Sequence, residues 1–360
     1  MRPQPTHDRL RARALALYLP QFHPIPENDE WWEPGFTEWT NVVRARRFYP
    51  GHYQPHLPAD LGFYDLRLLD SLHAQASLAS DHGLEGFVFW HYWFAGRRLL
   101  ETPVDLWCSP DGPNFGFALA WANQTWTGHW HGTATRVLVE QTYPPGDDEA
   151  HFAALLPAFT DARYITIDGR PLFYVFRGED LPEPKRFVDT WQALARRAGL
   201  DGLFLVAELN DPLGRSTYAD PMADGFDAAV DLQLPARRTA VTTAMMRGLR
   251  RLGRPEIYPY ATRPLDRPPL DVHRPVLPAV VPGWDNSPRS GGRGLVLHGS
   301  TPERFRVHVR DAINRLAQLP AERRLLIVKS WNEWAEGNHL EPDQRFGRRY
   351  LEVLAAELRS

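Results

Sequence analysis

Two glutamates near the C-terminal end offer the clearest chemistry in the sequence. Glu333 and Glu336 lie three positions apart, so a single turn of backbone would bring their Cβ atoms to about 5–6 Å from one another. Retaining hydrolysis of a glycosidic bond needs two carboxyl groups about 5–5.5 Å apart, whereas an inverting pair is wider because water lies between them. Two like charges this close raise one of the two pKa values, and the carboxyl group that stays protonated can act as a general acid.

The residues around this pair decide between two interpretations of it. A Glu-x-x-Glu spacing is common on solvated helix faces, and the spacing alone would favour that interpretation. Here the pair follows the apolar run 325–329, alternates with Trp331 and Trp334, and precedes Gly337. This context favours a catalytic pair at the end of a buried strand.

Short apolar runs that alternate with amphipathic stretches must position such a pair. The runs that are apolar enough for strands buried on both faces are 14–19, 86–90, 115–121, 172–176, 203–207, 228–232, 276–281 and 325–329. The stretches with helical periodicity are 66–82, 149–161, 185–198, 239–252, 302–319 and 348–358. Thr301 before Pro302 is typical of a helix start, and Gly199 suits a left-handed C-terminal cap.

The alternation predicts an α/β fold, a single (β/α)8 TIM barrel, rather than an open doubly wound sheet. We expect one catalytic domain over residues 1–360, with residues 1–12 as a flexible N-terminus. The segment 31–62 is rich in proline and aromatic residues and is predicted to be a long loop on the active face. Active sites of such barrels lie at the C-terminal ends of the strands.

Aromatic residues gather at those predicted strand ends. Eleven of the 13 tryptophans lie in the loops after strands or in the first long loop, and only Trp107 and Trp191 lie elsewhere. Indole faces stack on the C–H faces of sugars, so tryptophans beside carboxylates and amides favour a carbohydrate site, although tryptophan can also plug a barrel mouth. The expected platforms beside a groove are Trp39, Trp126, Trp284 and Trp334. The other expected substrate contacts at strand ends are Tyr18, His23, Trp90, His91, Tyr92, Trp121, Asn123, Asp285 and Asn332.

The composition excludes several classes of protein. Hydrophobic residues make up 43% and charged residues 24% of the chain, which is typical of a globular protein. The net charge of −3 gives no reason to expect a nucleic-acid partner, and no apolar run approaches the ~20 residues of a membrane span. The basic N-terminal segment has a short apolar run and no small-residue cleavage site, so we expect a cytoplasmic protein. The sequence leaves the oligomeric state open.

The sequence predicts neither a metal nor a cofactor. Cys108 is the only cysteine, which excludes an internal disulfide and a cysteine-based metal cluster. No His-x-x-x-His helix is present, and roles in the core or in binding hydroxyl groups explain the histidines equally well. The histidines considered are His52, His56, His91, His129, His131 and His339. No glycine-rich phosphate loop follows a predicted strand, which counts against a doubly wound nucleotide-sugar fold.

The segment from Trp331 to Asp343, WNEWAEGNHLEPD, resembles the signature of the glycoside hydrolase family 99-like domain, often labelled a WbsX-type glycosyltransferase. Other matching segments are GFTEWTNV at 35–42, GHYQP at 51–55, LGFYDL at 61–66, HYWF at 91–94, WAN at 121–123 and PGWDN at 282–286. The resemblance runs from about Leu15 to Leu354 and implies a (β/α)8 barrel. It also implies substrate contacts at Glu38, His339 and Glu341, whereas Gln124 stands where many relatives carry glutamate.

The resemblance also implies a mechanism. Family 99 enzymes are retaining endo-acting α-mannosidases with a Glu-x-x-Glu pair, which similarity places on Glu333 and Glu336. Glu336 is then the general acid/base. Glu333 deprotonates the sugar 2-hydroxyl, which displaces the leaving group through a 1,2-anhydro intermediate. The residues alone leave open direct nucleophilic attack by Glu333.

The predicted function is therefore retaining hydrolysis of an α-linked glycan, mannose-like or a bacterial polysaccharide, with an oligosaccharide or polysaccharide as the partner. One alternative is a glycosyltransferase or transglycosylase that uses the same pair in polysaccharide biosynthesis. The other is a non-catalytic glycan-binding barrel, which the intact pair disfavours because binding does not need two close carboxylates.

Overall fold

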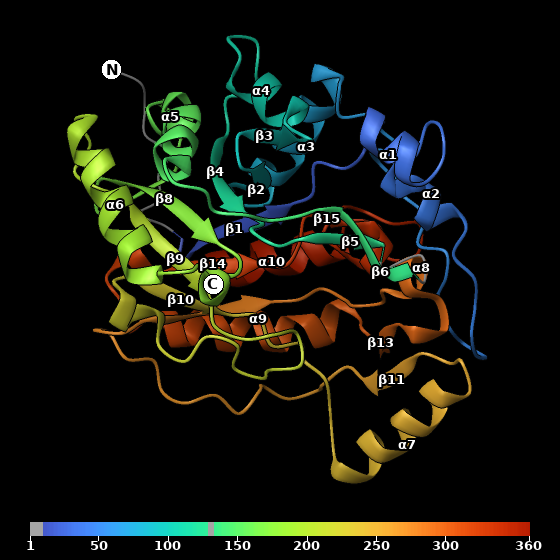
Figure 1. Cartoon of the computed structure of the whole chain (residues 1–360). Coiled ribbons are helices and arrows are strands. Elements are labelled where there is room, and N and C mark those ends of the chain that lie inside the picture. Colours follow the sequence, from blue (N-terminus) through green and yellow to red (C-terminus); the bar gives the residue numbers. More distant parts are fainter. Residues whose placement is uncertain (1–9, 129–132) are drawn as a thin grey trace.

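Eight parallel strands close into a barrel in the computed structural model, which describes residues 10–128 and 133–360 (Figure 1). The strands are β1 (Arg13–Tyr18), β2 (Leu84–Phe94), β4 (Gly116–Trp121), β8 (Arg170–Val175), β9 (Phe204–Glu208), β10 (Ala228–Asp231), β12 (Val276–Val280) and β14 (Leu325–Val328). Each pairs in parallel with its neighbour in this order, and β1 pairs with both β2 and β14. All eight predicted runs form strands, so the predicted (β/α)8 barrel is confirmed.

The barrel closes because its strands bury both of their faces. Along β1, every residue from Ala14 to Tyr18 is inaccessible to solvent. Inside, Phe87 packs against Tyr18 and Trp331, with ring centroids 5.1 and 4.9 Å apart. Large aromatic side chains thus fill the barrel, which is a packed core and not a pore.

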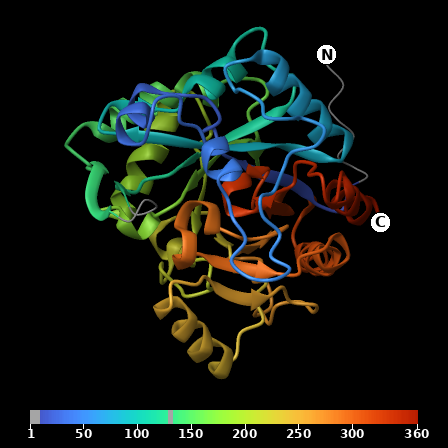
Figure 2. The ribbon, with the colours of Figure 1, turned by 90° about the vertical axis from the view of Figure 1, so that its right-hand side faces the viewer.

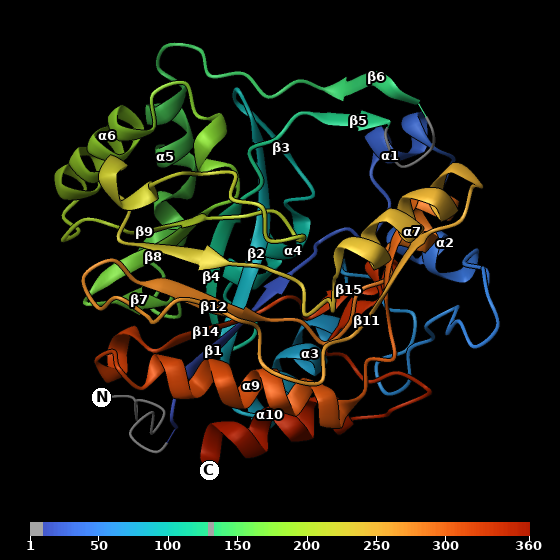
Figure 3. The same cartoon turned by 90° about the horizontal axis from the view of Figure 1, so that it is seen from below.

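The helices follow the predicted amphipathic stretches. They are α3 (Leu69–Asp81), α5 (Asp147–Phe159), α6 (Pro184–Arg197), α7 (Ala240–Arg251), α9 (Pro302–Leu316) and α10 (Arg349–Arg359). The Thr301 side chain accepts a hydrogen bond from the Arg304 N–H, and Gly199 has a φ of +84°, as the sequence predicted for both positions. The sequence analysis missed α4 (Thr102–Cys108), a seven-residue helix after β2 that is too short for a clear periodicity. Helices α9 and α10 lie side by side (Figure 3).

Shorter elements are added to the barrel, and four groups of them surround its mouth. The first long loop contains α1 (Pro26–Trp31) and α2 (Glu38–Val43). After β4, the strands β5 (Trp126–Gly128) and β6 (Thr133–Val139) form a hairpin. After β12 comes α8 (Ser287–Ser290), and after β14 the short hairpin of β15 (Asn332–Glu333) and β16 (Asn338–His339). The remaining short strands are β3 (Arg97–Leu99), which pairs with β2, and β7 (Thr166–Ile167), which pairs with β8.

A small second core lies beside the barrel. Strands β11 (Glu256–Pro259) and β13 (Leu295–His298) form a separate parallel pair, and α7 packs on it. Its buried residues are Leu234, Met246, Tyr258, Tyr260, Val281, Trp284 and Leu297. This unit projects from the barrel (Figures 1 and 2), and the sequence analysis did not predict it as a sheet.

Within the described part of the chain, no helix combines the length and the apolar character needed to cross a membrane.

A close approach between β2 and β4 gives a test of the barrel packing. A Cβ on Gly86 would lie 2.3 Å from the Gly116 carbonyl oxygen and 2.6 Å from Cδ1 of Ile165. We expect Gly86→Ala to lower the free energy of unfolding by about 1–3 kcal/mol, because backbone must move to admit the methyl group. Urea denaturation measures the change.

The matched control is Gly248→Ala in α7, where a new Cβ meets no atom within 4 Å outside its own helix among the described residues. That variant should gain about 0.5–1 kcal/mol from the helix preference of alanine over glycine. If Gly86→Ala were as stable as the unchanged protein, the close packing of β2 on β4 would be wrong.

Candidate active site

Arg289 binds three carboxylates at the mouth of the barrel. Its Nη2 donates to Oε2 of Glu333 and its Nη1 to Oε1 of Glu336, each at 2.8 Å. Its Nε donates to both carboxylate oxygens of Glu38, at 3.2 and 3.1 Å. The Arg289 side chain is 4% exposed and that of Glu38 is 0% exposed, so this ion cluster lies inside the protein. One guanidinium therefore fixes both members of the Glu333/Glu336 pair.

The hairpin after β14 presents that pair. Glu333 ends β15, and Glu336 lies in the 3-10 turn Trp334–Glu336 that follows it. The Ser330 hydroxyl accepts from the Glu333 N–H at 3.0 Å and donates to the Asn338 carbonyl at 3.1 Å, which joins the two arms of the hairpin. The Asn332 side chain exchanges two hydrogen bonds with the backbone of Leu19, at 2.7 and 3.0 Å, and so anchors the hairpin to the end of β1.

The loop after β12 presents Arg289. Asp285 lies in this loop just before α8 and accepts hydrogen bonds from Gln54 and the Ser287 N–H, while His52 bonds to the same carboxylate at 2.6 Å. The Asp285 N–H also donates to the Glu336 carbonyl oxygen at 2.5 Å. These contacts hold α8 against the hairpin, so arginine and glutamates are positioned by neighbouring strands of the barrel.

The pair borders a cavity of about 550 Å³, which is within the usual range of small-molecule sites. The aromatic residues that line it are Trp31, Trp32, Trp90, Tyr92, Trp126, Phe176 and Trp284. The charged and amide residues that line it are Gln21, Asn28, Gln124, Arg177, Glu208, Asn210, Asp211, Arg289, Lys329, Glu333 and Glu336. Indole faces and hydrogen-bonding groups in one cavity suit a ligand with both C–H faces and hydroxyl groups.

Burial controls the charge state of the carboxyl groups here. Burial raises the pKa of Glu333, and the nearby Glu336 and Glu38 charges raise it further, while Arg289 opposes the rise. Burial raises the pKa of Glu38 as well, again against Arg289. Burial also raises the pKa of Glu208, another residue of the cavity lining, to about 7 although Lys329 lowers it. Burial therefore raises the pKa values of two carboxyl groups on the cavity wall, Glu333 and Glu208.

Six of the predicted site residues line this cavity: Trp90, Tyr92, Trp126, Trp284, Glu333 and Glu336. Glu38 joins them through Arg289. The structure thus gathers, around one cavity, residues that come from the first loop, β2, the β5–β6 hairpin, the β12 loop and the β14 hairpin.

Other predicted contacts lie behind the cavity wall. Glu341 accepts hydrogen bonds from Tyr64, Gln75 and the Trp334 indole at 2.9, 2.8 and 2.5 Å, and Tyr18 donates to Gln75. This buried network supports the hairpin. The remaining predicted residues outside the lining given above are His23, Trp39, His91, Trp121, Asn123, Asp285, Asn332 and His339.

The groove predicted between four tryptophans differs from the observed cavity. Trp126 and Trp284 line it, whereas Trp39 and Trp334 pack on each other behind it, with ring centroids 5.7 Å apart. The reason is that their indole N–H groups find buried acceptors, the Tyr64 carbonyl for Trp39 and Glu341 for Trp334. Trp31 and Trp32 line the cavity instead.

The predicted site residues omit five charged residues of the cavity: Arg177, Glu208, Asp211, Arg289 and Lys329. Arg289 is one of many arginines and lies in the unremarkable segment Ser287–Ser290. Glu208 and Lys329 carried a weak signal, since each follows or ends a buried strand, and Lys329 is one of only two lysines. The considered residues His129, Trp130 and His131 lie outside the described part of the chain.

The chain is similar in sequence to a known protein family and to two curated relatives. A family described as glycosyltransferase WbsX matches residues 14–354. Two relatives named WxcX, from two strains of Xanthomonas campestris pv. campestris, are 39% and 40% identical over 356 and 360 residues. These matches cover 98% of this chain and 50% of each relative, so the chain spans about half the length of the curated relatives it matches.

Solved structures share the fold at low sequence identity. A glycoside hydrolase-like protein matches with a TM-score of 0.58 and 14% identity, over 100% of this chain and 97% of the other. The GH99 endo-α-mannosidase from Bacteroides thetaiotaomicron matches with a TM-score of 0.57 and 12% identity, over 96% of each chain. These likenesses support the TIM-barrel architecture.

Replacement of Arg289 tests the ion cluster. Arg289→Met keeps an unbranched side chain but leaves three buried carboxylates without their cation, which we expect to cost about 3–5 kcal/mol of folding stability. The loss should be larger at pH 8 than at pH 5, because protonated carboxyl groups need no cation. Urea denaturation at both pH values measures it. Arg67→Met, which removes an exposed pair with Asp65, should change stability by at most about 1 kcal/mol. Equal losses in the two variants would contradict the buried cluster.

Glu208 gives a pH test with a definite sign. Its pKa rises from 4.5 to about 7 on folding, so below pH 4.5 it is protonated in both states. Between these values only the folded chain keeps the proton, and stability falls as pH rises towards 7. Glu208→Gln stays neutral and should gain stability relative to the unchanged protein from pH 5 to pH 8, by an amount on the order of 3 kcal/mol. For the exposed Glu352→Gln, we expect the free energy of unfolding to vary with pH in parallel with that of the unchanged protein. The same parallel behaviour in Glu208→Gln would contradict the raised pKa.

Proposed function

The chain belongs to the WbsX family, and we propose that its barrel is a retaining glycoside hydrolase that cleaves an α-linked glycan, mannose-like or a bacterial polysaccharide. The observation that carries this proposal is the Glu333/Glu336 pair, held by one guanidinium at the edge of an indole-lined cavity. The shared architecture with an endo-α-mannosidase is consistent with it.

In the proposed first step, Glu336 donates a proton to the glycosidic oxygen as the bond from C1 to that oxygen breaks. Glu333 takes the proton of the sugar 2-hydroxyl, and the 2-oxygen forms a bond to C1, which gives a 1,2-anhydro sugar. In the second step the Glu336 carboxylate deprotonates water, which attacks C1 and breaks the bond between C1 and the 2-oxygen. This opens the three-membered ring, and Glu333 returns its proton to the 2-oxygen. Two inversions at C1 give net retention.

The environment of Glu333 suits the base in this scheme. A carboxylate whose pKa is raised by burial is a stronger base, and bases with pKa values closer to neutrality are more effective catalysts. Arg289 positions both carboxylates through one rigid fork, which a lysine could not replace. Glu208 and Lys329 on the cavity wall are available to bind hydroxyl groups of the substrate.

The name of the family favours a second candidate, a glycosyltransferase or transglycosylase that uses the same pair. In that case a sugar hydroxyl takes the place of water in the second step. Incubation of the protein with glycan donors, with and without sugar acceptors, distinguishes the two activities, since the transferase forms a longer product and the hydrolase does not. NMR of the first product formed shows whether the anomeric configuration is retained.

The two glutamates should fail in different ways when they are replaced. Glu336→Gln cannot protonate a leaving oxygen, so activity on a natural glycan should fall about 10²–10⁴-fold while an activated aryl glycoside is partly spared. Glu333→Gln should impair both substrates because the attacking oxygen is no longer generated. Initial rates on the two substrates measure this, with the exposed Glu352→Gln as the control. If both active-site variants kept full turnover on a verified substrate, the pair would be structural, and the barrel would be at most a glycan-binding protein.

A 2-deoxy or 2-fluoro substrate separates the two roles proposed for Glu333. Participation of the 2-hydroxyl predicts neither turnover nor a trapped adduct, because the attacking oxygen is missing. Direct attack by Glu333 predicts a covalent glycosyl-enzyme, which intact-protein mass spectrometry detects. A trapped adduct on Glu333 would therefore exclude the 1,2-anhydro route.

A further inference from the structure

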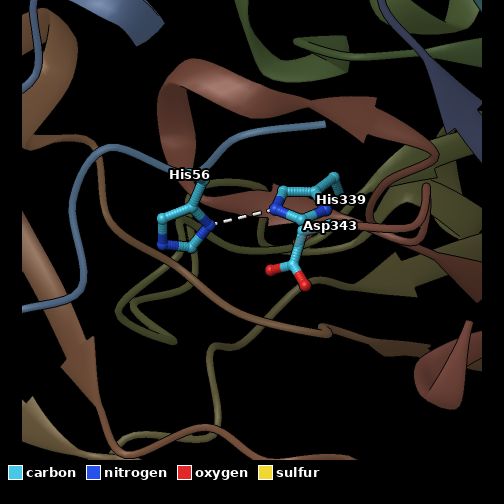
Figure 4. A group of neighbouring side chains, drawn as sticks. All are labelled: His56, His339 and Asp343. Atoms are coloured by element: carbon cyan, nitrogen blue, oxygen red, sulfur yellow. Dashed lines mark hydrogen bonds between the residues drawn. The ribbon is translucent and has the colours of Figure 1, made fainter. Parts of the chain in front are cut away.

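Two histidines and an aspartate form a second cluster beside the hairpin that carries the catalytic pair. Nδ1 of His56 and Nε2 of His339 are hydrogen-bonded at 3.0 Å, and one atom of each of His56, His339 and Asp343 lies within 4.8 Å of the others. His339 and Asp343 are buried and His56 is half-buried. Figure 4 shows the two imidazoles facing one another with the carboxylate beside them. The three side chains line a separate cavity of about 140 Å³.

The second ring nitrogen of His339 is already bound. Its Nδ1 lies 3.0 Å from the Glu341 carbonyl oxygen, which can only accept, so Nδ1 carries the proton. In neutral imidazole this leaves a lone pair on Nε2, the atom that faces His56. A backbone carbonyl that fixes the tautomer in this way is the usual outer-shell partner of a metal-binding histidine.

The Asp343 carboxylate is also oriented. Its Oδ1 accepts from the backbone N–H groups of Arg345 and Phe346, at 3.1 and 2.6 Å. Its Oδ2 has a longer contact of 3.3 Å with the Tyr53 hydroxyl. Oδ1 therefore holds the side chain in place, and Oδ2, which accepts one hydrogen bond from Tyr53, keeps a second lone pair for a metal.

We propose that His56, His339 and Asp343 bind a divalent transition metal of the Zn²⁺ type, with the fourth position open to the cavity. Zinc–nitrogen bonds of about 2.0–2.1 Å in a tetrahedron place two nitrogen ligands roughly 3.3 Å apart. The two imidazole nitrogens are hydrogen-bonded at 3.0 Å, so a small separation of the rings would replace this hydrogen bond with two bonds to the metal. Two imidazoles and one carboxylate select zinc-like ions over Mg²⁺ or Ca²⁺, which prefer oxygen ligands only.

The ion would join two segments that frame the active site. His56 follows His52 and Gln54, both of which bind Asp285. His339 follows Glu336 in the β15–β16 hairpin, whose Gly337 lies against Asp285 and His56. The metal would therefore hold the first long loop against the hairpin, as a structural ion that does not touch substrate. The proposal does not depend on the proposed hydrolase activity.

Metal titration of the full chain tests this proposal. The protein is first treated with a chelator, which is then removed. We expect calorimetry to show binding of one equivalent of Zn²⁺, and we expect the bound Zn²⁺ to raise the thermal unfolding midpoint of the protein. One equivalent of Co²⁺ should give the visible absorption of a four-coordinate site. His56→Ala and His339→Gln should each weaken binding by more than the roughly 10–100-fold cost of losing an outer-shell partner.

His298→Ala is the matched control, because His298 lines the same cavity but bonds to Tyr49 and lies outside the cluster. It should keep the full equivalent of metal. His56 is half-buried, so its replacement tests the site even where the change at buried His339 prevents folding. The absence of Zn²⁺ and Co²⁺ binding, or binding that His56→Ala leaves unchanged, would overturn the proposal.

Discussion

The placement of Arg289 is the constraint on which the rest of the site depends. A guanidinium with 4% exposure is tolerable only where carboxylates and hydrogen bonds compensate for the lost water. Here the carboxylates come from two regions far apart in the sequence: α2 supplies one, and the end of β15 with the turn after it supplies the other two. Folding must therefore bring the first long loop, the β12 loop and the β14 hairpin together, and the cavity is the space that remains between them.

The layer behind the cavity exists to keep these loops in register. The Asp285 carboxylate accepts hydrogen bonds from Gln54 and the Ser287 N–H, and His52 is hydrogen-bonded to the same carboxylate. The Asp285 N–H donates to the Glu336 carbonyl oxygen. In the second network, Glu341 accepts hydrogen bonds from three donors, one of them the Trp334 indole N–H. Buried polar groups of this kind are costly unless every member is satisfied, so each network tolerates little displacement of the hairpin. That rigidity is what the catalytic role proposed for Glu333 and Glu336 requires.

The barrel could be predicted from the sequence because each strand is buried on both faces and so appears as a continuous apolar run. Glu333 and Glu336 could be found because their spacing and neighbouring indoles are local. Arg289 could not, since its partners are distant in sequence and nothing in the segment Ser287–Ser290 marks it. The orientation of the tryptophans could not be predicted either, because it too depends on partners that meet only in the folded chain. Trp39 and Trp334 match Trp126 and Trp284 in type and loop position, and only the acceptor that each indole N–H finds in three dimensions turns the first two inward.

The β15–β16 hairpin and the residues that follow it to Asp343 combine these constraints in one short segment. Glu333 and Glu336 face Arg289, while His339 and Asp343 face His56 on the neighbouring cavity. Gly337 connects the two halves with a φ of +55°, and a Cβ there would lie 2.9 Å from Cβ of Asp285. Asp285 is the residue that organises α8, so any larger side chain at position 337 would press on the loop that carries Arg289. The close approach of Asp285 thus requires glycine at position 337 of the Glu-x-x-Glu-Gly sequence. Because Asp285 also organises the loop that carries Arg289, the same glycine allows the arginine to reach both glutamates.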